Sequence, residues 1–363
     1  MAWPLSQDYN EAVQNPRTSF SDPELRDGQP TLNPLGLPMP RSGNFADVYE
    51  FVCPATQGRW AVKCFTRQVA GLRERYSEIS RHLQDARLPF TVDFQYLEQG
   101  IRIRGQWYPI LKMRWVEGLL LNEFVRDNLD KPALLQSLSQ IWVRMARRLR
   151  EADAAHCDLQ HGNVLLVPGA KNTSLAVKLI DYDGMFVPAL ARSNSGEVGH
   201  ANYQHPSRAR EGTYSLEVDR VPLLVVATAL RGLIIGGRGL WDRHDNGDNL
   251  LFKESDLRDP PRSAVFNELA QLSDPLLQTL VGHLSQACQG KLESAPLLHE
   301  LLPEEKPPAP ARTPARASGA VTTTPTASQP VDWDFTESAA PVRRRRKQGG
   351  VPVWSWVAGG AAV

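Results

Sequence analysis

The sequence predicts an α+β protein in which a small β-rich lobe precedes a larger α-helical lobe. Two runs of β-type residues, 45–52 and 60–65, flank a turn at residues 56–58, and this arrangement is typical of a β-hairpin. Farther along, residues 133–152 place apolar side chains on one helical stripe, and residues 219–235 are almost continuously apolar. The order of these elements gives the predicted architecture.

Apolar spacing predicts further elements between and within these regions. Strand-like pieces are expected near residues 90–96 and 107–115. The run at 219–235 is expected to be a buried helix, because a membrane span needs roughly 20 apolar residues and Arg231 interrupts this one. An amphipathic helix over residues 70–83 is indicated by apolar residues at intervals of three and four: Leu72, Tyr76, Ile79 and Leu83.

The composition is that of a globular protein able to bury a sizeable core, with 42% hydrophobic and 22% charged residues among 363. A formal net charge of +1 gives no global attraction to nucleic acid, which is not an expected partner. The N-terminus lacks the pattern of a secretory signal peptide, so the globular part of the chain is expected in the cytoplasm. Four cysteines lie far apart without a CxxC pair, which argues against a zinc site or a disulfide framework: Cys53, Cys64, Cys157 and Cys288.

The C-terminal part has a different character. Residues 303–342 are rich in Pro, Ala and Thr and are expected to form a disordered linker. A basic segment follows at 343–350, and residues 351–363 are apolar with two tryptophans, the order expected on entering a bilayer from the cytoplasmic side. We therefore expect attachment to the inner membrane by a helix that this sequence enters but does not complete. The alternative is a solvated basic cluster or a nucleic-acid contact.

One octapeptide, His156-Cys157-Asp158-Leu159-Gln160-His161-Gly162-Asn163, carries the strongest chemical signal. Asp158 and Asn163 lie five positions apart, and Asp181-Tyr182-Asp183-Gly184 follows a predicted strand. Phosphoryl transfer from ATP needs these parts: a carboxylate that orients the attacking hydroxyl, and an amide oxygen and a second carboxylate that hold magnesium. The alternative is a plain turn in which Asp and Asn cap backbone groups.

A lysine that could contact phosphate lies upstream. Lys63 ends the apolar strand 61–63, after the predicted hairpin. An acidic residue on the following helix is expected to hold its ammonium group, and Glu78 is favoured over Glu74 because it lies beside Tyr76. A solvated strand-edge lysine is the alternative.

In these motifs the chain resembles a eukaryotic-type protein kinase, of the kind also found in bacteria, over residues 36–302. The resemblance implies a two-lobed protein-kinase-like fold, with an N-lobe at 36–117 and a C-lobe at 118–302, after an N-terminal extension at 1–35. It also implies that residues 110–118 form the hinge that binds adenine. Asp219 resembles the buried aspartate that braces the catalytic loop, although a solvated helix cap is the alternative reading of this residue.

The resemblance implies ATP as the cofactor, with Mg²⁺ or alternatively Mn²⁺. It implies Asp158 and Lys63 as catalytic residues and Asn163 and Asp181 as metal ligands. The residues it implies around the nucleotide are Gly43, Phe45, Val48, Ala61, Lys63, Glu78, Met113, Trp115, Asn163 and Asp181.

Several positions depart from the family pattern. The glycine-rich loop retains only Gly43, so its backbone approach to phosphate is less close. Asp183 replaces the usual glycine after Asp181, and either aspartate could be the main metal ligand. Cys157 and Gln160 stand where the family usually has arginine and lysine.

The expected function is therefore transfer of the γ-phosphoryl group of ATP to serine or threonine of a protein substrate, in membrane-tethered signalling. One alternative is a pseudokinase that binds nucleotide or acts as a scaffold, which the weak glycine loop suggests. Another is a small-molecule phosphotransferase, because the octapeptide is also similar to that of such kinases. The sequence identifies neither the substrate nor the activating signal.

Overall fold

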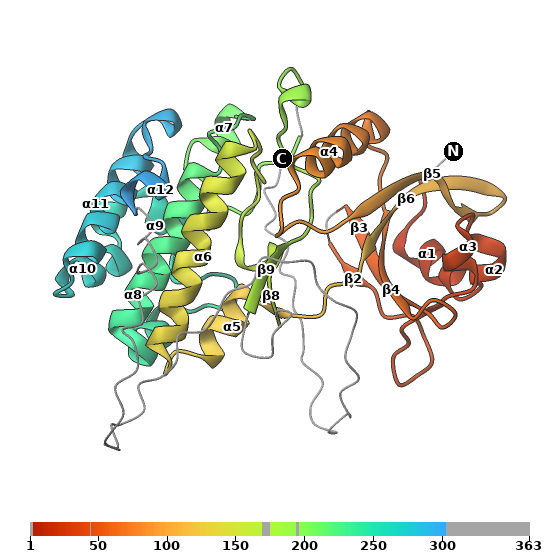
Figure 1. Ribbon diagram of the computed structural model, residues 1–363, viewed down its shortest axis with the longest axis horizontal. Helices are drawn as coiled ribbons and strands as arrows, with labels where there is room; N and C mark the ends of the chain where they lie inside the picture. The colour runs from red at the N-terminus through yellow and green to blue at the C-terminus, as the bar shows by residue number, and fades with distance from the viewer. Residues whose placement is uncertain (1–2, 44, 169–174, 194–195, 303–363) are drawn as a thin grey trace, which may run out of the picture.

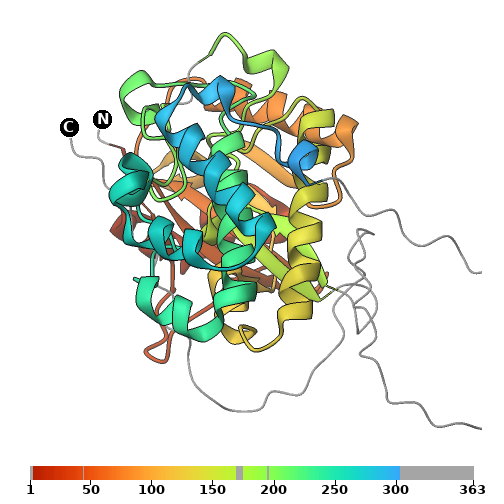
Figure 2. The same cartoon turned by 90° about the vertical axis from the view of Figure 1, so that its left-hand side faces the viewer.

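The computed structural model describes residues 3–43, 45–168, 175–193 and 196–302, and within them the protein is a mixed α+β structure. Antiparallel strands gather at one side of the molecule and long helices at the other (Figure 1). In the perpendicular view the helices lie in front of the strands (Figure 2). The predicted α+β class is confirmed.

The larger sheet has the strand order β1-β3-β4-β6-β5, with β2 also paired to β3, and every pair is antiparallel. The predicted hairpin is confirmed as β3 and β4, whose register sets Val48 opposite Lys63. Arg104 and Gly105 join β5 to β6 with positive φ angles of 49° and 84°, the backbone of a tight two-residue turn. The strands are β1 (Gln29–Pro30), β2 (Arg41–Ser42), β3 (Ala46–Cys53), β4 (Gly58–Phe65), β5 (Phe94–Ile103) and β6 (Gln106–Arg114).

The strand predicted at 90–96 begins only at Phe94, so the prediction is wrong for its first four residues. The backbone of those residues bonds elsewhere. The carbonyl of Phe90 accepts a hydrogen bond from the Leu179 N–H at 2.8 Å, and the Val92 N–H donates to the Tyr182 hydroxyl at 2.8 Å. This segment therefore joins the large sheet to the second, smaller one.

Alternation along β4 directs its side chains to two different surroundings. Val62 and Cys64 are fully buried in a cluster with the N-terminal helices. Phe65 and the half-buried Ala61 pack instead in the main core, on the face that also carries Lys63. Because each face has its own cover, the sheet places Lys63 toward the interior of the molecule.

The N-terminal residues form one of these covers through three short helices, α1 (Ser6–Val13), α2 (Pro16–Ser19) and α3 (Pro23–Arg26). Lys112, 4% exposed, forms ion pairs of 3.0 Å with both Asp22 and Glu24. β1 pairs with β3, so the described residues before position 36 belong to the packing of the sheet rather than to a separate extension. Their buried apolar side chains are Tyr9, Val13, Phe20 and Leu25.

Helix α4 (Leu72–Ala86) confirms the predicted amphipathic helix and packs against the sheet. A three-stranded sheet of β7 (Leu119–Leu120), β8 (Val164–Pro168) and β9 (Leu175–Leu179) follows and lies between the large sheet and the long helices (Figure 1). The remaining helices are α5 (Leu121–Asp127), α6 (Pro132–Glu151), α7 (Arg208–Glu211), α8 (Arg220–His244), α9 (Glu254–Arg258), α10 (Ala264–Gln271), α11 (Pro275–Gln289) and α12 (Leu298–Leu301), with single 3₁₀ turns at His161–Asn163, Pro188–Leu190, Pro260–Arg262 and Leu292–Ser294.

Helices α6 and α8 confirm the two long helices expected from the sequence. The Trp142 indole of α6 donates to the Leu223 carbonyl of α8 at 3.0 Å, and Arg231 pairs with Asp274 at the start of α11. Within the described residues α8 alone is long and apolar enough to cross a membrane, and 61% of its most apolar stretch is buried inside the protein. It is therefore placed as a core helix. The predicted linker, basic segment and C-terminal apolar segment (303–363) lie outside the described residues.

Candidate functional site

The loop between α6 and β8 brings Asp158 and Asn163 together. A 3₁₀ turn at His161–Asn163 reverses the chain, so that the Asn163 amide donates to the Asp158 carboxylate at 2.9 Å and to its main-chain oxygen at 3.0 Å. Asn163 is fully buried, and Asp158 is half-buried. The five-residue spacing thus does bring both side chains to one place.

Asp219 supports this loop from the start of α8. It is 4% exposed, and its carboxylate accepts hydrogen bonds from the N–H groups of His156 (2.5 Å) and Cys157 (2.8 Å). Burial raises the pKa of this carboxyl, which His156 and the two N–H donors partly oppose. The geometry is that of a buried brace and not of a solvated helix cap.

Lys63 meets the acidic turn after β9. Its ammonium group lies 2.8 Å from Asp181 and 2.5 Å from Asp183. Burial lowers the pKa of Lys63, but the two carboxylates outweigh this and raise it well above its usual range. Burial raises the pKa of both carboxyls as well. Lys63 nevertheless holds that of Asp181 below its usual value, whereas that of Asp183 stays raised.

The backbone at this site is strained at two positions. Cys157 and Asp181 both have φ = 66°, in the left-handed region that residues with a side chain rarely occupy. Such strain persists where the surrounding structure fixes it, and it clusters at functional sites. The buried Tyr182 anchors the turn, because its hydroxyl donates to the Leu179 carbonyl at 2.6 Å and accepts from the Val92 N–H. The Tyr182 hydroxyl therefore adds a polar anchor here.

Glu78 does not pair with Lys63 as predicted, but with Arg81 one turn along the same helix. The buried stripe of α4 is turned so that Arg75 and Tyr76 face the acidic turn, which leaves Glu78 beside the site. Glu74, the alternative, is exposed. The sequence held one overlooked signal, since Arg75 falls on the apolar stripe of the helix, as a buried cation would.

The inner face of the large sheet carries four of the ten residues expected around a nucleotide. The register sets Val48 opposite Lys63 and Ala61 opposite Met113, so all four side chains share one face of three adjacent strands. Met113 is 7% exposed, so its side chain is buried on this face.

Trp115 follows the end of β6, and its main-chain N–H donates to the Arg59 carbonyl at 2.9 Å. The Arg41 guanidinium stacks 4.5 Å from the centre of its ring. Gly43 and Phe45 lie in the connection from β2 to β3, where the Gly43 N–H donates to the Ala46 carbonyl at 2.9 Å.

The segment after residue 196 contacts the loop of residues 156–163. The His200 N–H donates to Asp158 at 2.7 Å, and Gly199 approaches so closely that a Cβ there would lie 2.9 Å from the same carboxylate. Arg208, 1% exposed, donates to the Cys157 carbonyl and to Gln204. A guanidinium from this segment therefore contacts the loop at Cys157.

Glu197 adds a further carboxyl beside the turn, with Oε2 3.2 Å from the position a Cβ on Gly184 would take. Burial, together with the neighbouring charges of Asp183 and Asp181, raises the pKa of Glu197 to about 8. Sequence reasoning missed Glu197, Arg208 and His200, because their partners are distant in the chain and no local pattern marks them.

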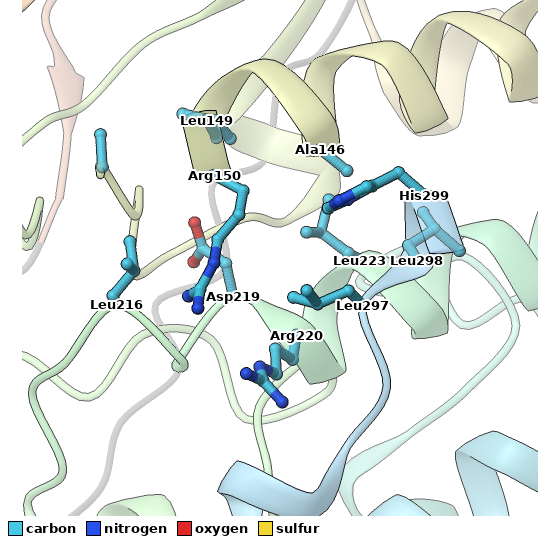
Figure 3. A pocket seen from close by; sticks show the side chains of 11 residues that line it. Ala146, Leu149, Arg150, Leu216, Asp219, Arg220, Leu223, Leu297, Leu298 and His299 are labelled. Atoms are coloured by element: carbon cyan, nitrogen blue, oxygen red, sulfur yellow. The ribbon is translucent and has the colours of Figure 1, made fainter. Parts of the chain in front are cut away.

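A separate cavity lies between α6, the start of α8 and α12 (Figure 3). Its wall includes Arg150, Asp219 and His299 but neither Lys63 nor Asp158. It therefore shares Asp219 with the support of the 156–163 loop and is not the expected nucleotide site.

The donor set at Asn163 and Asp181 fits a magnesium ion bound with a phosphate. Among the described residues no three His, Cys, Asp or Glu side chains could hold a metal by themselves. Magnesium needs fewer protein ligands when phosphate and water oxygens complete its shell. The buried Oδ1 of Asn163 has no hydrogen-bond partner in the described structure, and burial penalises such an atom unless another group satisfies it.

The chain matches no protein-family model, and no curated protein is significantly similar to it in sequence.

Proposed function

We propose that this protein is an ATP- and Mg²⁺-dependent protein kinase that transfers the γ-phosphoryl group to serine or threonine. One observation carries the proposal: Lys63, Asp158, Asn163 and Asp181 come from three separate segments and form two bonded pairs beside one another. Lys63 pairs with Asp181 at 2.8 Å, and Asn163 bonds Asp158 at 2.9 Å. Phosphoryl transfer depends on placing such groups around ATP rather than on covalent chemistry of the protein.

The proposal includes a two-lobed arrangement, with ATP between residues 36–117 and 118–302. The separation of the large sheet from the long helices supports it (Figure 1). Attachment of the kinase to the inner membrane through residues 343–363 is also proposed, on the order of basic and apolar residues in the sequence.

Each residue has a distinct proposed role. Mg²⁺, or Mn²⁺ in its place, would neutralise charge on the phosphate oxygens, and Asn163 and Asp181 would hold it. Lys63 would give up part of its hydrogen bonding to the two aspartates and donate to a phosphate oxygen instead. Asp158 would orient the acceptor hydroxyl, because its carboxylate oxygens keep a lone pair beyond those used by Asn163, Gln160 and His200.

A catalytically weak nucleotide-binding protein is the second candidate. It is favoured by the presence of only one glycine, Gly43, in the loop directly before β3. It is also favoured by Arg41, which stacks on Trp115 at the expected adenine site. A small-molecule phosphotransferase is less favoured, because residues 185–206 are long enough to offer a platform for a peptide.

Transfer of labelled γ-phosphate to a protein mixture tests the proposal. We expect Asp158→Ala to lower incorporation by about 10²-fold or more, the range over which a positioned acid or base acts. Asp85→Ala, at an exposed position on α4, is the matched control and should retain activity. Equal incorporation by wild type and Asp158→Ala would exclude the assigned role, and binding of ATP without any transfer would favour the second candidate.

A further inference from the structure

Asp181 and Asp183 both bond Lys63, but their surroundings differ. The Asp183 side chain is 12% exposed, and both of its oxygens are engaged, one by Lys63 and the other by the Tyr76 hydroxyl. The Asp181 side chain is 37% exposed, and Lys63 bonds its Oδ1 alone. Asp181 therefore keeps one oxygen that neither Lys63 nor Tyr76 bonds, and its side chain is more exposed than that of Asp183.

Helix α4 holds Asp183 by its main chain as well. The Arg75 guanidinium is 9% exposed and donates to the carbonyl of Asp183 at 2.6 Å and to that of Met185 at 3.1 Å. Tyr214 closes the cluster, since its hydroxyl donates to the Met185 carbonyl at 2.8 Å and its ring lies 5.3 Å from the guanidinium. Two neighbouring residues of α4 thus bind the same aspartate, one by its carboxylate and one by its carbonyl.

We infer that Asp183 performs the task that the family resemblance gave to a helix glutamate: it fixes Lys63, and Tyr76 and Arg75 fix Asp183 in turn. The inference rests on the proposed function and assigns the metal to Asp181. Because the second carboxylate, Asp183, lies on the acidic turn itself, helix α4 contributes hydrogen-bond donors instead of a carboxylate. This explains why Glu78 is free to pair with Arg81. Arg75 is a positioning residue that couples α4 to the acidic turn.

Binding of Mn²⁺ in the presence of the ATP analogue AMP-PNP, measured by electron paramagnetic resonance, tests the division between the two aspartates. We expect Asp181→Asn to weaken Mn²⁺ binding by about 10-fold or more. At saturating AMP-PNP, we expect Asp183→Asn to change Mn²⁺ binding much less than Asp181→Asn does, while it weakens the binding of AMP-PNP itself through Lys63. The reverse pattern, equal losses in both variants, or no Mn²⁺ binding by the wild type would overturn the assignment.

Hydrogen exchange in the peptide over residues 183–190 tests the role of Arg75. Arg75→Met should speed exchange there by about 10-fold or more, because it removes a buried donor shared by two carbonyls. Arg75→Lys should recover part of the protection with one donor. Arg73→Met, which removes an exposed arginine from the same helix, is the matched control and should leave exchange unchanged. Unchanged exchange in Arg75→Met contradicts the coupling.

These readouts need no turnover, so the two proposals can fail separately. A protein that binds Mn²⁺ through Asp181 but transfers no phosphate would refute the kinase proposal and retain this inference. An active enzyme whose Mn²⁺ binding depends on Asp183 would do the opposite.

Discussion

Replacement of Asp219 by alanine should both destabilise the protein and displace the catalytic loop. The carboxylate accepts the N–H groups of His156 and Cys157 in a site where Asp219 is 4% exposed. Alanine leaves both donors buried without that acceptor. The loss falls directly before Asp158, so stability and activity should change together.

The magnitude follows from these two bonds. A hydrogen bond to a charged group contributes about 1.5–3 kcal/mol, so two give roughly 3–6 kcal/mol. Part of this is offset because burial of the carboxylate is itself unfavourable, as its raised pKa indicates. We expect a net loss of about 2–4 kcal/mol, a large fraction of the roughly 5–15 kcal/mol that stabilises an ordinary domain. A displacement of Asp158 by about 1 Å can lower turnover about 10²-fold.

Urea unfolding followed by tryptophan fluorescence measures the first effect, and phosphate transfer measures the second. Asp242→Ala is the matched control, since it removes an exposed aspartate from the same helix. If Asp219→Ala unfolded within about 0.5 kcal/mol of this control and kept full activity, the bracing role of Asp219 would be refuted.

Two further outcomes are expected. Phe20→Ala should cost about 3–5 kcal/mol in urea unfolding, because this ring is 2% exposed and packs edge-on against Phe51 at 5.1 Å, which makes the N-terminal helices part of the folded core; a loss below about 1 kcal/mol would contradict that packing. For Glu197, the pKa is raised from 4.5 to about 8, so the folded state keeps a proton that the unfolded chain releases, and the contribution of this group to stability falls as pH rises through that window. As pH rises from about 5 to about 9, the unfolding free energy of wild type should therefore fall relative to that of Glu197→Gln. Parallel pH profiles of the two proteins would contradict the raised pKa.

Local periodicity was sufficient to predict the elements that depend on it. Two runs of β-type residues around a turn in 45–65 predicted the β3–β4 hairpin, and the apolar stripes of α4 and α6 predicted which of their faces are buried. The N-terminal helices were not predicted, because helices as short as α2 and α3 are stable only through tertiary packing, and their partners lie on strands far along the chain.

Only part of the site was predicted, because some of its residues are brought together locally and others only by tertiary packing. Asp158 and Asn163 meet because a short local turn connects them, so their spacing was informative. The choice of Glu78 was wrong because neighbouring residues of a helix point in different directions, and the sequence does not show which of them faces a given partner. The packed helix shows that Arg75 and Tyr76 face the acidic turn at residues 181–184. Contacts with distant main-chain carbonyls leave no pattern in a sequence.

Mass-spectrometric mapping of phosphosites tests the central claim most directly. The full chain is incubated with Mg²⁺, ATP and a protein mixture, beside Asp158→Ala and the Asp85→Ala control. The proposal predicts phosphoserine or phosphothreonine that is produced by wild type and control and is absent with Asp158→Ala. Identical phosphosites with Asp158→Ala, or none with any of the three, would contradict it.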